Sequence, residues 1–144
     1  MSTSNKAAWE AIQSHLAAVG YVKDSMIGEP HDAIESHTVA IIPMGGKVDA
    51  LTLQSPREVH YVTLRYYIDW LEQPQEETEC TLDQFRADIL ADICGAFQLG
   101  GAVAYALPAE FSWEYGGDML GQTGYRTLDL TIAYRVDDNA TFAP

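Results

Sequence analysis

Two stretches of this chain, residues 58–71 and 125–137, alternate apolar and polar side chains for longer than most strands run. A period of two is typical of a half-buried strand, so we predict a strand in each. At roughly 3.3 Å per residue the first would span about 46 Å, whereas a compact chain of this length is about 38 Å across. We therefore expect projecting strands with unpaired edges, which favours self-assembly. The apolar faces are Val62, Leu64, Tyr66, Ile68 and Trp70 in the first strand, and Leu128, Leu130, Ile132, Tyr134 and Val136 in the second.

The composition fits one globular domain over residues 1–144, with residues 1–4 and 138–144 expected to be loose. Of the 144 residues 47% are hydrophobic, and the formal net charge is -13, which argues against a nucleic-acid binder. We see no signal peptide and no segment long enough to cross a bilayer, so we expect no membrane partner. Cys80 and Cys94 are expected to be reduced thiols.

Two amphipathic helices are predicted. The first follows a cap at Ser4 and ends at Gly20, and the second begins with the capping box that starts at Thr81 and ends after Leu99. Their apolar positions recur every three or four residues, as on one face of a helix. These positions are Trp9, Ile12, Leu16 and Val19 in the first helix, and Leu82, Phe85, Ile89, Ile93 and Phe97 in the second.

The remaining segments are predicted as loops and short strands. Residues 23–37 carry glycine, proline and charges without a period and indicate a long loop. Residues 38–42 form a short strand that ends at Pro43 and the Gly45-Gly46 turn, with residues 51–53 as a hairpin partner. Residues 103–107 and 111–115 form brief strands, and the glycine-rich residues 116–124 form a flexible connection.

This order of elements predicts an α+β fold: a single sheet, largely antiparallel or mixed, with both helices packed on one face and long projecting strands. The second face of the long strands is polar but rich in tyrosine. It is either a solvated face with cross-strand ion pairs, such as Arg65 or Arg135 with Asp129 or Asp69, or a surface between subunits. The residues that we assign to such an intersubunit surface are Tyr61, Arg65, Tyr67, Tyr125, Asp129 and Arg135.

No catalytic motif is present, so we expect no enzyme activity, no catalytic residue, no metal site and no cofactor. One alternative is a divalent metal site in the long loop, since His31, Asp32, Glu35 and His37 are of the types that zinc or manganese bind. A calcium site at residues 137–139 lacks the glycine and glutamate of the loop motif.

Acidic residues gather between residues 69 and 92, where Arg86 is the one basic residue. They form either a solvated face that keeps the chain soluble or a functional patch. In the second case Glu72, Glu76, Glu77 and Glu79 would form a lumen wall past which DNA slides, or a docking site for a basic partner.

The chain resembles the tail terminator proteins of long-tailed bacteriophages over residues 5–138. Three segments carry the resemblance: the arm-like residues 57–71, the helix end Leu99-Gly100-Gly101-Ala102-Val103, and the closing residues 125–136. The resemblance implies a virion protein, assembled in the bacterial host cytoplasm, that forms a ring of six subunits. Such a ring caps the tail tube, stops its polymerisation and joins the tube to the head connector.

The implied partners are further copies of the chain, the major tail tube protein and the head-completion or connector protein, with the tape measure protein as a further candidate. DNA passes through the lumen without specific contacts. Residues 23–37, 72–81 and 116–124 would order only on contact with the tube, with Gly116, Gly117 and Asp118 as a mobile loop toward the partner.

Three other functions stay open. A head-completion or stopper protein of the same neck would also form a ring. A small metal-binding enzyme would be monomeric or dimeric and would retain its metal. An acidic inhibitor of a basic toxin or nuclease would explain the charge but would leave the long strands without a purpose.

Overall fold

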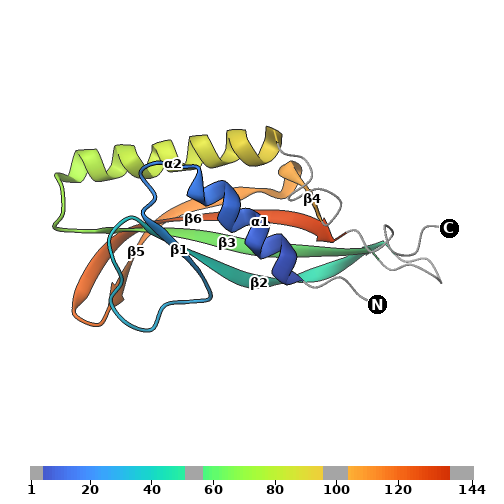
Figure 1. Cartoon of the computed structure of the whole chain (residues 1–144), viewed down its shortest axis with the longest axis horizontal. Coiled ribbons are helices and arrows are strands. Elements are labelled where there is room, and N and C mark those ends of the chain that lie inside the picture. Colours follow the sequence, from blue (N-terminus) through green and yellow to red (C-terminus); the bar gives the residue numbers. More distant parts are fainter. Residues whose placement is uncertain (1–4, 51–56, 96–103, 137–144) are drawn as a thin grey trace.

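A computed structural model describes residues 5–50, 57–95 and 104–136 as one mixed sheet with two helices (Figure 1). Residues 1–4, 51–56, 96–103 and 137–144 lie outside the described residues, and with them the predicted Ser4 cap, the 51–53 hairpin partner, the helix end at Leu99 and the loose 138–144 tail. The elements follow in the order α1 Asn5–Ala17, β1 Asp24–Ile27, β2 Thr38–Ala50, β3 Arg57–Asp69, α2 Gln75–Gly95, β4 Ala104–Ala106, the 3-10 turn η1 Pro108–Glu110, β5 Ser112–Leu120 and β6 Thr123–Val136.

The two long predicted strands are β3 and β6, and they form the centre of the sheet. They pair antiparallel from Val59 opposite Arg135 to Asp69 opposite Tyr125. The strand order is β1-β2-β3-β6-β4, and β5 also pairs with β6, beside β4. Because β1 runs parallel to β2 while the other pairs are antiparallel, the sheet is mixed. The predicted fold class is confirmed.

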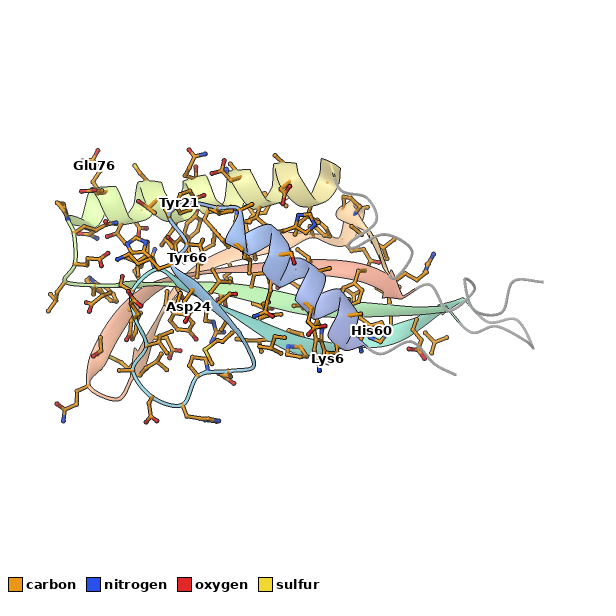
Figure 2. The ribbon with its side chains drawn as sticks, in the orientation of Figure 1. Lys6, Tyr21, Asp24, His60, Tyr66 and Glu76 are labelled. Carbon is orange, nitrogen blue, oxygen red and sulfur yellow. The ribbon has the colours of Figure 1, made fainter. Side chains whose placement is uncertain are left out.

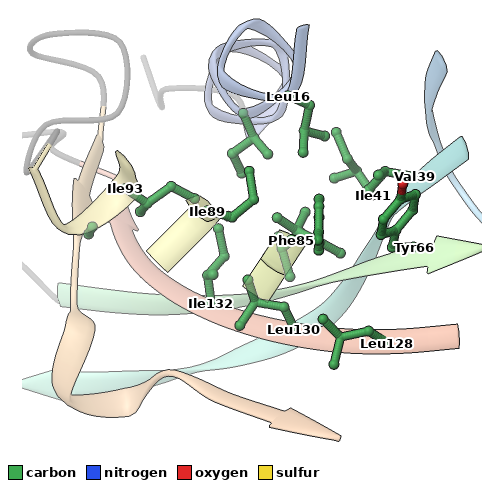
Figure 3. Packing of buried hydrophobic residues seen from close by; sticks show 14 of the residues in the cluster. Leu16, Val39, Ile41, Tyr66, Phe85, Ile89, Ile93, Leu128, Leu130 and Ile132 are labelled. Atoms are coloured by element: carbon green, nitrogen blue, oxygen red, sulfur yellow. The ribbon is translucent and has the colours of Figure 1, made fainter. Parts of the chain in front are cut away.

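Both helices cover the same face of the sheet, and the main core lies between them and the central strands (Figure 3). The alternation in β3 and β6 supplies one wall of this core and the helical repeats supply the other. Trp70 is an exception, because β3 ends at Asp69 and the Trp70 side chain is 52% exposed. The buried residues include Ile12 and Leu16 from α1, Phe85, Ile89 and Ile93 from α2, Leu64 and Tyr66 from β3, and Leu128, Leu130 and Ile132 from β6.

The second face of the sheet carries a smaller core, which the sequence did not predict. Tyr67 and Tyr125 are buried there edge to face, with ring centroids 5.5 Å apart. The segment between β1 and β2 covers them, and Tyr125 holds it: its hydroxyl accepts a hydrogen bond from the Ile34 amide (3.0 Å) and donates one to the Ile34 carbonyl (2.6 Å). A face predicted to be polar and open is therefore partly closed by a loop of the same chain.

The strand β2 is much longer than predicted. It continues through Pro43 and the Gly45-Gly46 pair, because a β-bulge at that point inserts one residue where we expected a turn. Gly46 is required there, since a Cβ atom on it would lie 2.3 Å from the Val59 carbonyl oxygen. Proline fits because, among the described residues, β1 pairs with β2 only as far as Ile41 and no strand adjoins the outer side of Pro43.

All three segments predicted to be mobile contain regular structure. Residues 23–37 include β1, whose pairing with β2 the irregular sequence concealed. The helix α2 begins at Gln75 and so takes up most of residues 72–81. Gly116, Gly117 and Asp118 lie in the middle of β5, opposite Thr127, Arg126 and Tyr125, so the prediction of a mobile loop there is wrong.

Candidate subunit interface

The sheet has two open strand edges on opposite sides. Among the described residues, β1 pairs only with Thr38–Ile41 of β2, which leaves residues 42–50 with no strand beyond them. On the other side, within the part of the chain that the structure describes, β5 pairs with β6 alone. The long strands β3 and β6 are paired on both sides, so the prediction that they carry the unpaired edges is wrong. Among the described strands, unused backbone hydrogen-bonding groups lie instead on the outer strands, and the longest such stretches are on β2 beyond Ile41 and on β5.

The open edge of β2 combines apolar exposure with one lysine. The C-terminal end of β2, together with the start of β3, extends past both helices (Figure 1). Met44 and Val48 are 59% and 54% exposed, and Val48 lines a hollow of about 380 Å³ together with Glu58 and His60 of β3. Figure 2 places His60 near this end of the sheet. The Lys47 side chain lies on the face of the sheet that points away from the helices.

Lys47 belongs to a polar cluster that ties β2 and β3 to the turn η1. Its ammonium lies 3.3 Å from a Glu110 carboxylate oxygen, to which the Tyr61 hydroxyl also donates a hydrogen bond of 2.7 Å. Hydrogen bonding to Tyr61 and Glu110 raises the pKa of Lys47, and the bond from Tyr61 lowers the pKa of Glu110. Lys47 is therefore a cation at neutral pH, on an edge that is otherwise largely apolar.

The edge at β5 carries exposed aromatic side chains beside a groove. Trp113 is 47% and Met119 63% exposed, and Tyr115 lines the groove, which lies between β5 and α2 and has a volume of about 590 Å³. The Arg86 guanidinium lies 4.9 Å from the centre of the Trp113 ring, and the Tyr115 hydroxyl donates to Asp83 at 2.9 Å. These contacts fix both aromatic rings toward α2.

The predicted acidic patch is only partly free. Arg126 donates two hydrogen bonds to Glu79, of 2.7 and 2.8 Å, which hold the pKa of Glu79 below its usual value. Glu72 binds the His37 imidazole. Glu76 and Glu77 are exposed in the first turn of α2, where a negative charge is favourable to the helix dipole. Two of the four carboxylates therefore have partners within the chain.

The predicted intersubunit face does not form one exposed surface. Tyr67 and Tyr125 are buried within the chain and cannot reach a neighbour, because the segment that contains Ile34 covers them. Arg65 forms an ion pair with Asp129, opposite it in the register, at 2.7 Å. This pair is the one expected for a solvated face. Tyr61 donates its hydroxyl hydrogen bond to Glu110 of the same chain. Arg135, the last residue of the predicted face, is half-buried opposite Val59.

Polar contacts from His15 and Tyr21 join the N-terminal helical segment to α2. Tyr21 donates to Asp88 at 2.7 Å, and His15 binds Asp92, so both acidic residues on this side of α2 have partners (Figure 2 labels Tyr21). His37 binds the Tyr66 hydroxyl as well as Glu72. No group of three or more metal-ligating side chains is close enough to hold an ion within the described ranges, so the alternative metal site gains no support.

Sequence reasoning missed the exposed residues of the two edges. The signal was present in β5, where Trp113, Tyr115, Gly117 and Met119 continue the alternation through glycines that we took for a loop. In β2 the bulge shifts the period by one residue, which conceals Val48.

Comparison with protein-family models gave no match, and comparison with curated protein sequences gave none either. Within the described residues, neither helix is long and apolar enough to span a membrane.

Proposed function

We propose that this chain is a structural subunit of a ring, a tail terminator of a long-tailed bacteriophage, which caps the tail tube and joins it to the head connector. One observation carries the proposal: a single sheet has two different open edges on opposite sides. A ring needs a heterologous interface, in which two different patches of each copy meet. The two edges supply such a pair.

A ring satisfies both edges, whereas a twofold dimer satisfies one. In a dimer each copy would use the same edge, and the other edge would stay open to further pairing. In a closed ring every copy uses both the free stretch of β2 and the outer edge of β5. Two complementary edges are compatible with closed rings of different sizes, and six copies is the number that the resemblance implies.

The charge of the chain supports a channel through which DNA passes. With a formal net charge of -13, the chain repels phosphates and does not retain them. Glu76 and Glu77 are exposed and have no basic partner among the contacts described above, so they are candidates for the lumen or for docking a basic surface of the tube protein. The proposed role requires no cofactor.

The proposal is tested by assembly with the tail tube protein encoded in the same genome. The purified chain is first studied alone by mass photometry at rising concentration, and is then added to polymerising tube subunits for negative-stain electron microscopy. We expect rings on one end of each tube and shorter tubes at higher ratios of chain to tube protein. A chain that stays monomeric at every concentration and labels no tube end contradicts the proposal.

The same assay separates a terminator from a stopper. A stopper of the same neck binds isolated connector rings and leaves tube growth unchanged. In that case the ring is retained and its position in the neck is revised.

A further inference from the structure

We propose that the open edge of β2 in one copy pairs with the outer edge of β5 in the next, so that one sheet continues from copy to copy. This inference rests on the proposed ring and names the two surfaces that build it. The open stretch of β2, residues 42–50, is interrupted by register shifts between Pro43 and Gly46 and between Val48 and Ala50, so the proposed pairing is centred on Gly46–Val48, against part of the 9-residue strand β5.

The strand directions fix the sense of this pairing. β2 is antiparallel to β3, β3 to β6 and β6 to β5, so β2 and β5 run in opposite directions within one copy. A neighbour in the same orientation therefore brings its β2 antiparallel to β5. Antiparallel pairing keeps the helices of both copies on the same face of the continued sheet.

On the helix side of the sheet the two edges are both apolar. Trp113 and Tyr115 lie opposite Leu130 and Leu128, which belong to the main core, so their side chains are on the helix side. Val48 lies opposite Glu58, on the same side of β3 as His60, which stacks on buried Tyr134. In the continued sheet Val48 of one copy lies beside the aromatic rings of the next, at the groove between α2 and β5. Pairs of aromatic and β-branched residues are among the favourable cross-strand neighbours.

On the other side the two edges have opposite charge. Lys47 is 52% exposed and lies opposite Val59, so it points away from the helices. Glu114 and Asp118 of β5 point the same way, since they lie opposite Asp129 and Tyr125. An antiparallel register that places Val48 beside Trp113 also places Lys47 beside Glu114. Both faces therefore match at once over Gly46–Val48, on one side of the bulge.

Pairing of like edges is disfavoured by the same charges. Two β5 edges would bring the exposed Glu114 carboxylate of one copy toward the acidic side chains of the other, and like charges opposite each other destabilise a sheet; Asp118 contributes less, because Arg65 of its own copy lies 3.8 Å from it. Two β2 edges would bring the Lys47 ammoniums together. The charge pattern thus selects a β2 edge against a β5 edge, which is the heterologous contact that a ring needs.

The contact is tested by cross-linking engineered cysteines. In a Cys80→Ser, Cys94→Ser background, Lys47→Cys and Glu114→Cys are combined and treated with a short bismaleimide, which also bridges positions one pair out of register. We expect a ladder of cross-linked copies up to the ring size, with the link mapped between residues 47 and 114 by mass spectrometry. The control combines Glu114→Cys with Ser14→Cys on the exposed side of α1 and should stay monomeric on a denaturing gel.

A charge exchange gives a second measurement. Because Lys47 also pairs with Glu110 of its own copy, the exchange is made in a Glu110→Gln background. There Lys47→Glu and Glu114→Lys should each lower the fraction of chains in rings by several-fold at fixed concentration, and the double exchange should restore most of it. Thermal unfolding of dilute monomer serves as the folding control. A double variant that assembles no better than the single variants overturns the proposed contact.

The two proposals fail in different ways. Rings on tube ends without the link from 47 to 114 contradict the edge contact and leave the function standing. A link between 47 and 114 in open filaments, or in rings that ignore the tube, supports the contact and contradicts the function.

Discussion

Replacing Gly46 by alanine should destabilise the fold through a clash with backbone. The new Cβ atom would lie 2.3 Å from the Val59 carbonyl oxygen, so a strand must shift. Overpacking of this kind costs about 1–3 kcal/mol, and the loss of chain entropy in the unfolded state offsets about 0.4–1 kcal/mol of it. We expect a net loss of about 1–2 kcal/mol, which corresponds to a melting temperature lower by roughly 2–8 °C for a chain of this size.

The measurement is urea unfolding followed by circular dichroism, at a concentration where the chain is monomeric, so that assembly does not contribute. Gly20→Ala is the matched control, because nothing lies within 4 Å of a Cβ atom there. It should be neutral or slightly stabilising. If Gly46→Ala is as stable as the unmodified chain, the bulge does not bring β2 as close to β3 as described, and the assignment of Lys47 and Val48 to opposite faces loses its basis.

Three further predictions concern the two cores. Phe85→Ala should lower the free energy of unfolding by about 3–5 kcal/mol, because Phe85 is fully buried against Tyr66. Denaturant unfolding measures this change, and a loss below about 1 kcal/mol would contradict the placement of Phe85 in the core. Tyr125→Phe should leave both polar backbone groups of Ile34 without their partner and speed hydrogen exchange of that amide, while unchanged exchange would show that the loop is held by other contacts. Burial raises the pKa of Tyr134 to about 12, above its unfolded value of about 10, so the folded state holds this proton more tightly. The free energy of unfolding should be unaffected below pH 10 and fall as the pH rises from 10 to 12. Tyr134→Phe should flatten that fall in alkaline unfolding curves.

The sequence by itself determined the elements whose pattern is strong and uninterrupted. The alternation in β3 and β6 and the helical repeat around Ile12 and Phe85 each place apolar side chains on one face. The period of the side chains follows from local backbone geometry, so it can be recognised in the sequence without knowing what the apolar face of the helix or strand packs against. The pairing of Arg65 with Asp129 was one of a few combinations that the sequence allowed, and the register selected it.

Tertiary structure alone decided which edges stay open and which tyrosines are available to a neighbour. Tyr67 and Tyr125 read as surface residues because the loop that covers them lies far away in the sequence and has no pattern of its own. The β-bulge at Gly46 and the glycines of β5 hide strands for a related reason: a glycine can serve a turn or a close approach between backbones, and the distance to the next strand decides between them. Strand partners are set by contacts between distant segments, and local sequence does not encode those distances.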